Sequence, residues 1–167
     1  MAAHGILHNW RFRWVNFYPP FLGAGIRVVH RESDDYRITV RLKLTWFNRN
    51  AVGTHFGGSL YAMCDPFFML ILMQHLGREY TVWDKSATIR FRKPGLGTMT
   101  ATFHVPPETI SEVRMQADQG EKIEPLFSVD VVDEQGDVVA TVEKRLYVRR
   151  RTEPGPVSSF EPEGGET

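Results

Sequence analysis

The chain has 167 residues, and its 20 Lys and Arg residues balance its 20 Asp and Glu residues to a formal net charge of zero. That length suits one ordinary domain, and the zero net charge removes the bulk electrostatic argument for nucleic-acid binding, in which a basic face usually dominates the affinity. The single cysteine, Cys64, excludes an intramolecular disulfide and provides no pair of Cys ligands for a zinc site.

The chain begins with a segment that is expected to be helical and continues into a hairpin. Residues 1–22 carry aromatic and aliphatic residues at loosely helical spacings, up to Pro19-Pro20. Residues 26–31 are short and β-branched. From Ile38 to Trp46, apolar residues alternate with charged residues and threonines, which is typical of a strand with one buried face. A turn signal at 33–35 joins the two strands.

Residues 59–76 are apolar on nearly every side, which predicts a long helix enclosed by the rest of the protein. Gly77 suits the position that ends such a helix. The run is too short and too interrupted to span a bilayer, and no secretory signal is evident, so we expect a cytoplasmic protein. One alternative stays open, because Asp65-Pro66 also has the pattern of a helix start and would divide the segment into two short helices.

The rest of the chain is mostly strand. Strands are predicted over 81–91, 98–105, 123–133 and 137–149, and the last two are joined by a turn at 134–136. Thr109 and Glu112 match a capping box that opens a short helix, and residues 150–167 are expected to form a disordered tail. We therefore expect one α+β domain over 23–149, in which a curved antiparallel sheet wraps around a long central helix.

The most informative residues lie between Asn50 and Asp65. A glycine-rich loop enters the helix there, and Gly57 and Gly58 would let a substrate approach backbone amides that lack helical partners, as in an oxyanion hole. Asp65 is the only carboxylate on the apolar helix, and such a group usually has a partner or a chemical role. Plainer interpretations remain open, in which the two glycines and Asn50 only make turns.

This spacing resembles that of the hotdog-fold acyl-CoA thioesterases, and most of all their phenylacetyl-CoA thioesterase branch. Asn50, Gly57-Gly58 and Asp65 match without a gap, and the turn 93–95 is similar to the one after the family's third strand. The resemblance implies a hotdog fold over about residues 20–149. It implies that Asp65 is the nucleophile or general base, that the Gly57 amide binds the oxyanion, and that Asn50 orients water or substrate.

The resemblance also implies an assembly and a substrate class. Hotdog proteins usually form homodimers or dimers of dimers with the site between subunits, so Asp65 is expected to face the partner chain's Gly57 loop. No cofactor is expected, since coenzyme A would be part of the substrate.

Two residues depart from the family pattern. Phe56 occupies the place of the family's histidine, and His55 beside it is either a loop histidine or a replacement. Lys85 lies in an apolar register of its strand, about where relatives have Ser or Thr near the catalytic Asp. We expect Lys85 to pair with Asp65 of the same or the partner chain; the alternative is that its ammonium reaches solvent.

The expected function is hydrolysis of an acyl-CoA or acyl-carrier thioester. The alternatives are a non-catalytic acyl-thioester-binding or regulatory module, favoured by Phe56, and a hotdog hydratase, disfavoured because no histidine occupies the required place. Expected catalytic residues are Asp65, Gly57, Asn50 and Lys85, and expected substrate-binding residues are Phe56, Gly58, His55, Tyr61, Trp83 and Arg92. Phe68, Met69 and Trp46 are further candidates for the acyl site, and Arg90 and Lys93 for the phosphates of coenzyme A.

Overall fold

The computed structural model describes residues 15–31 and 36–152. Its centre is a six-stranded sheet in the order β1-β2-β4-β5-β6-β3, with every neighbouring pair antiparallel. The strands are β1 (Ile26–Arg31), β2 (Arg37–Lys43), β3 (Tyr80–Phe91), β4 (Thr98–His104), β5 (Leu126–Val132) and β6 (Val138–Arg150). All the strands that the alternation of residues predicts are therefore present, within a few residues of the expected bounds.

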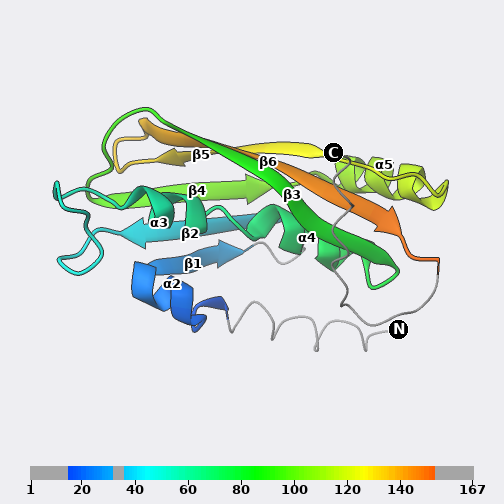
Figure 1. Ribbon diagram of the computed structural model, residues 1–167, viewed down its shortest axis with the longest axis horizontal. Coiled ribbons are helices and arrows are strands. Elements are labelled where there is room, and N and C mark those ends of the chain that lie inside the picture. Colours follow the sequence, from blue (N-terminus) through cyan, green and yellow to red (C-terminus); the bar gives the residue numbers. More distant parts are fainter. Residues whose placement is uncertain (1–14, 32–35, 153–167) are drawn as a thin grey trace, which may run out of the picture.

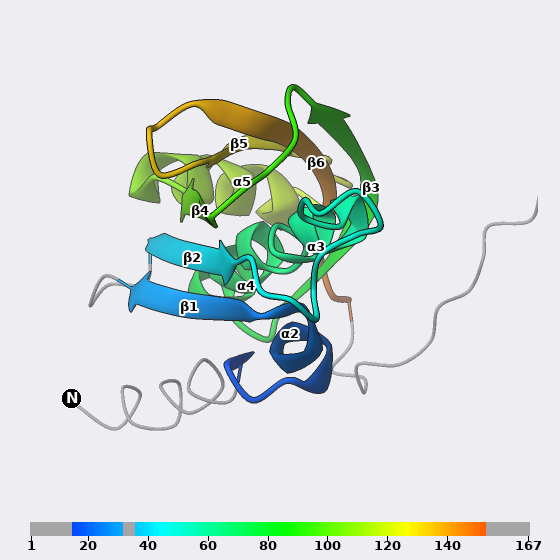
Figure 2. The same ribbon diagram turned by 90° about the vertical axis from the view of Figure 1, so that its left-hand side faces the viewer.

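The sheet curves around two helices, α3 (Gly57–Ala62) and α4 (Phe67–Leu76), as the end-on view shows (Figure 2). Two further helices, α2 (Pro19–Ala24) and α5 (Pro107–Asp118), lie beside β1 and at one end of the sheet (Figure 1). This arrangement confirms the predicted α+β architecture of a curved antiparallel sheet that wraps around a helical centre, but the predicted single long helix is two helices.

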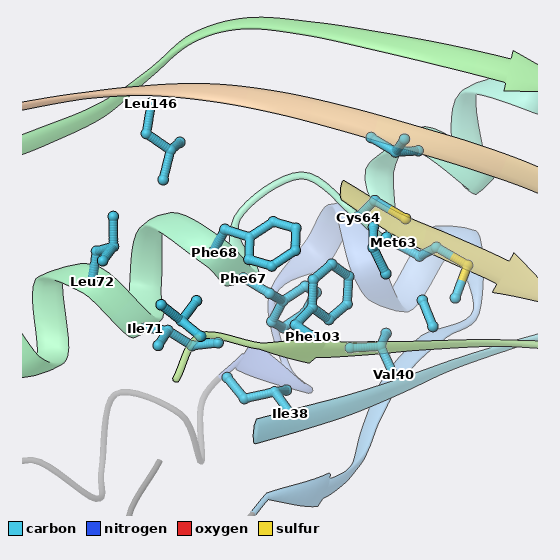
Figure 3. Packing of buried hydrophobic residues seen from close by; sticks show 14 of the residues in the cluster. Ile38, Val40, Met63, Cys64, Phe67, Phe68, Ile71, Leu72, Phe103 and Leu146 are labelled. Carbon is cyan, nitrogen blue, oxygen red and sulfur yellow. The ribbon is translucent and has the colours of Figure 1, made fainter. Parts of the chain in front are cut away.

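The core fills the space between α4 and the concave face of the sheet. Phe67 and Phe68 point from α4 toward Phe103 on β4, with ring centroids 4.9 and 5.2 Å from that of Phe103 (Figure 3). Strand residues at every second position, such as Ile38 and Val40, complete the packing and are fully buried. Burial of these side chains is the main favourable contribution to the fold.

The central helix is divided, as the open alternative required. Residues 63–66 form a turn between α3 and α4, and Pro66 is the N-cap of α4. A proline inside a helix lacks the N–H that the helical bond needs and clashes with the preceding turn, so the chain stops one helix and starts another. Asp65 consequently lies in a break between helices, not on a continuous helix.

Two other helix boundaries differ from expectation for one reason. Pro19 was expected to end a helix but begins α2, and Pro107 begins α5 two residues before the expected capping box at Thr109, which forms no side-chain cap. Proline is favoured in the first helical turn, where its missing N–H would have no partner and its φ is already helical. Of the predicted terminal segments, residues 1–14 and 153–167 lie outside the described residues.

β3 contains a bulge and forms one edge of the sheet. Asp84 pairs with Leu146 and Ser86 with Arg145, so Lys85 between them has no partner on β6. An extra residue of this kind reverses which side chains face the core on either side of it.

Among the described residues no helix is long and apolar enough to cross a membrane.

Candidate active site

Asp65 lies in the break between α3 and α4 and has two donors on a single oxygen. The Tyr61 hydroxyl donates to Asp65 Oδ1 at 2.9 Å, and Lys144 Nζ donates to the same oxygen at 3.1 Å. Tyr61 comes from one helical turn earlier, so the local helix geometry brings it to Asp65. The Asp65 side chain is 48% exposed, so its carboxylate is reachable from outside.

Lys144 on β6 is the centre of this cluster. Its side chain has no exposed surface, and its Nζ lies 2.9 Å from Asp84 Oδ2 on β3 as well as 3.1 Å from Asp65 Oδ1. It also contacts the Tyr61 hydroxyl at 3.3 Å. Buried lysines are rare without a counter-charge, and here two carboxylates share one ammonium.

The charges of this cluster follow from burial and from the two carboxylates. Burial lowers the pKa of Lys144, but the hydrogen bonds and charges of Asp84 and Asp65 outweigh it, so the pKa of Lys144 is raised. Burial raises the pKa of Asp84, and the ammonium of Lys144 only partly reverses this. Asp84 Oδ1 is buried and has no hydrogen-bond partner in the described chain. Lys144 is therefore stabilised as a cation here, while Asp84 is held in an environment that opposes its charge.

The neighbouring Cys64 is not a nucleophile. It is fully buried, and burial raises its pKa to about 12. A thiol with that pKa stays protonated at neutral pH, and reactivity belongs to the thiolate.

Gly57 and Gly58 begin α3, and their amides are open. Neither N–H donates to an acceptor within the part of the chain that the structure describes, because the first helical bonds are made by Ser59 and Leu60 to the Phe56 carbonyl. A side chain at Gly57 would place its Cβ 3.0 Å from Phe91 Cζ, and one at Gly58 would place its Cβ 2.4 Å from a Phe56 ring carbon. The glycines thus let two exposed aromatic rings lie against the start of the helix.

Asn50 and His55 brace the loop instead of facing an open site. The Asn50 side chain accepts bonds from the amides of Val52 and Thr54 and donates to Thr54 Oγ1 and the His55 carbonyl, which uses its full hydrogen-bonding capacity. His55 is buried, with Nε2 3.0 Å from the Gly97 carbonyl, and burial lowers its pKa. The turn interpretation of Asn50 and the loop-histidine interpretation of His55 fit these contacts.

The expected pair between Lys85 and Asp65 does not form within the chain. Lys85 is the bulged residue of β3, and its ammonium lies 2.5 Å from Glu124 on the outside of the sheet. The bulge likewise turns Trp83 to the outer face, where it stacks on Tyr147 at 4.2 Å between ring centroids. Trp83 is therefore outside the site, and Asp84, which alternation assigned to the polar face, faces Lys144.

The remaining candidates are distributed unevenly. Tyr61 belongs to the Asp65 cluster, Phe68 is core, Met69 is half-buried against the core, and Trp46 is 81% exposed beyond the end of β2. Lys93 is paired with Asp133 and Asp137. Arg90 and Arg92 are exposed and make no ion pair among the described residues. No group of three or more His, Cys, Asp or Glu in that part of the chain could hold a metal ion.

Two residues of the cluster, Lys144 and Asp84, are absent from the sequence-based set. For Lys144 the signal was present, since Val142, Leu146 and Val148 alternate around it in an apolar register. For Asp84 the signal was misleading, because a bulge cannot be read from the period of two.

Comparison with known proteins supports the family and the fold. The model of a family described as "Domain of unknown function (DUF4442)" matches residues 9–148. A search of curated proteins finds no match. Among solved structures, the chain is similar to a Pseudomonas aeruginosa protein of unknown function described as a "probable thioesterase", with a TM-score of 0.76 and 20% identity over 86% of this chain and 96% of that one.

Two further solved structures show the same fold. The PaaI protein of the Escherichia coli phenylacetic acid degradation operon has a TM-score of 0.59 and 19% identity, covering 87% of this chain and 94% of that one. A Haemophilus influenzae thioesterase has a TM-score of 0.61 and 14% identity, covering 83% and 88%. The chain thus belongs to the DUF4442 family and has the fold of the thioesterase-like hotdog proteins.

Proposed function

We propose that the protein hydrolyses an acyl thioester of coenzyme A or of an acyl carrier, with Asp65 as general base or nucleophile. The observation that carries this proposal is a half-exposed carboxylate, in a thioesterase-like hotdog fold, whose Oδ1 receives Tyr61 and Lys144 while Oδ2 has no donor among the described residues. An oriented carboxylate with one free oxygen is what attack on a thioester carbonyl requires.

Hydrolysis of the thioester by this route needs only Asp65, the Gly57 amide and one water molecule. As general base, Asp65 Oδ2 takes a proton from water, the water oxygen bonds to the carbonyl carbon, and the Gly57 amide stabilises the negative oxygen that results. The carbon–sulfur bond then breaks, sulfur leaves with the electron pair, and the proton passes from Asp65 to sulfur. The products are a carboxylic acid and a thiol. In the direct route, Oδ2 itself bonds to the carbonyl carbon and the carbon–sulfur bond breaks, so that sulfur leaves with the electron pair. Water then hydrolyses the resulting anhydride to the carboxylic acid and restores the Asp65 carboxylate, and the proton released passes to sulfur.

The Gly57 amide that serves Asp65 belongs to a partner subunit in this proposal. In one chain Gly57 begins α3 and Asp65 lies beyond its end, so the two are separated by the length of this six-residue helix, about 9 Å at the helical rise. One carbonyl group must lie about 3 Å from both its attacking atom and its oxyanion donor. A homodimer that brings one chain's Gly57 to the other's Asp65 satisfies both distances.

Substrate contacts extend from these two groups. The exposed rings of Phe56 and Phe91 beside Gly57 and Gly58 offer an apolar surface to an acyl group. Arg90 lies on β3 next to Phe91, and Arg92 lies just beyond the end of that strand. Both are cations available to the phosphates of coenzyme A.

The test is thiol release from a panel of acyl-CoA and acyl-carrier thioesters. Asp65→Asn keeps the shape of the side chain and its acceptor for Tyr61 but cannot act as a base, so we expect a loss of about 10²- to 10⁴-fold in kcat. Asp130→Asn, at an exposed carboxylate on β5, is the matched control and should be unaffected. Turnover that survives Asp65→Asn contradicts the assignment.

A second candidate function rests on Phe56. The ring that replaces the family's histidine is apolar and 59% exposed, which suits binding of an acyl chain more than polarisation of a carbonyl. Tight binding of an acyl-CoA without turnover of any thioester would favour an acyl-thioester-binding or regulatory module over a hydrolase.

A further inference from the structure

We infer that Lys144 is a positioning residue of the site: through Oδ1 it holds Asp65 with Oδ2 turned to the substrate, and Asp84 is the counter-charge that holds Lys144. This inference rests on the proposed function of Asp65 and assigns roles to two residues outside the resemblance to thioesterases.

The burial of Lys144 defines the kind of role it can have. Its side chain has no exposed surface, whereas the Asp65 carboxylate that it contacts is half exposed. Lys144 cannot reach a substrate that approaches Asp65 from outside. Any effect of Lys144 on the reaction must therefore pass through Asp65, by orientation and by charge.

The contacts also select one oxygen of Asp65. Both donors, the Tyr61 hydroxyl and Lys144 Nζ, contact Oδ1. A carboxylate held by two donors at one oxygen loses the freedom to rotate and presents the other oxygen in a defined direction. Oδ2 is the oxygen left to take a proton or to attack.

Asp84 makes this arrangement possible. It lies on β3, a different strand from the β6 of Lys144, and its Oδ2 lies 2.9 Å from the ammonium. The groups that face Lys144 are Asp65 from the break between helices, Asp84 from β3, the Tyr61 hydroxyl from α3, and the thiol of Cys64. Because Asp65 and Asp84 both contact the ammonium of Lys144, a change in the charge of one carboxylate affects the other.

This coupling predicts opposite effects of two substitutions on the pH dependence of thiol release. Lys144→Met removes the positive charge beside Asp65, so the acid limb of the kcat/KM profile should move to higher pH. Asp84→Asn removes the competing negative charge and keeps an acceptor for Lys144, so the limb should move to lower pH. We expect Lys144→Met to reduce kcat by about 10- to 100-fold with little change in KM, and Lys144→Arg to restore part of the rate.

Lys43→Met is the matched control, because Lys43 is an exposed lysine on β2, a strand that does not neighbour β6 or β3. It should leave both the rate and the acid limb unchanged. A merely structural Lys144 would lower the amount of folded protein without moving the limb, so limbs that coincide in wild type, Lys144→Met and Asp84→Asn overturn the inference. If Lys144→Met does not fold, the isosteric Asp84→Asn decides alone.

A second measurement keeps this inference separate from the proposed function. The carboxyl carbon of Asp84 is followed by NMR against pH in wild type and in Lys144→Met, which requires no turnover. Loss of the ammonium should move this titration to higher pH, and that movement supports the inference even if no thioester is hydrolysed. A titration that does not move overturns the inference even if the wild type is an active thioesterase.

Discussion

At the scale of single residues, Lys144 and His55 are both buried and ionisable, but different surroundings make their burial possible. Lys144 is buried charged because Asp65 and Asp84 surround it, whereas His55 is buried next to a single carbonyl, that of Gly97, and its Nδ1 has no partner in the described chain. A buried imidazole whose Nε2–H donates to one carbonyl is tolerated in its neutral form, whereas a second proton on Nδ1 would have no acceptor among the described residues. This is the physical reason that burial lowers the pKa of His55.

The lowered pKa of His55 predicts how stability depends on pH. In the unfolded chain the imidazole takes a proton as pH falls through about 6.5, while the folded chain resists it to lower pH. The unfolded state then binds more protons, so the free energy of unfolding falls as pH decreases from 7.5 to 5.5. His55→Gln is expected to lose less stability over this interval than wild type, measured by urea unfolding at one protein concentration.

A histidine elsewhere provides the control for that experiment. His104 is exposed at the end of β4, so His104→Gln should keep the wild-type dependence on pH. The same slope in His55→Gln and in wild type would show that His55 takes its proton equally well in both states.

At the scale of elements, the sequence predicts strands well and the exact facing of their residues less well. The period of two located β2, β3, β4 and β6, and the apolar character of 59–76 located the buried helices. The same rule that made Lys85 a candidate, a lysine in an apolar register, describes Lys144 on β6. The rule was misleading at Lys85 because this bulged residue moves the side chains that precede it on β3 to the opposite faces of the sheet.

The candidate site divides in the same way. Spacing along the chain identifies Asp65, Gly57 and Gly58, because those residues lie within one loop and the helices that follow it. Lys144 lies 79 residues from Asp65 along the chain. The contact between the two depends on how β6 packs beside β3 and beside the turn between α3 and α4. A local pattern carries no information about a pairing of that kind.

The start of α3 carries a prediction of its own. Gly57→Pro removes one N–H at the first helical position, where proline is well tolerated, and Phe56 already has φ −66° and ψ 127°, as a residue before proline needs. We expect thiol release to fall by about 10²- to 10³-fold, the usual cost of one oxyanion donor. Gly57→Ala adds a Cβ at the same place near Phe91 but keeps the N–H, so it should retain most of the activity. Equal losses in the two variants would assign the effect to crowding against Phe91.

At the scale of the whole molecule, β3 is an edge strand with an open inner face. It has 12 residues and, within residues 15–31 and 36–152, pairs on one side only, with β6. After the bulge, Ala87 and Phe91 point to the side of the helices but stay exposed. Long uncovered edges invite pairing with another chain, and exposed apolar side chains beside such an edge add to that tendency. A second copy placed along β3 would cover both features and lie close to Asp84 and Gly57.

This assembly predicts that two inactive variants can restore each other. Asp65→Asn and Gly57→Pro are co-expressed with different tags, and heterodimers are isolated through both tags. If each site combines Asp65 of one subunit with Gly57 of the other, one site of the heterodimer contains both defects and the other contains neither. The heterodimer should then have about half of the wild-type rate, since one of two symmetric sites is intact. If each site lies within one chain, both sites of the heterodimer carry one defect, and its rate will not exceed that of the parent variants.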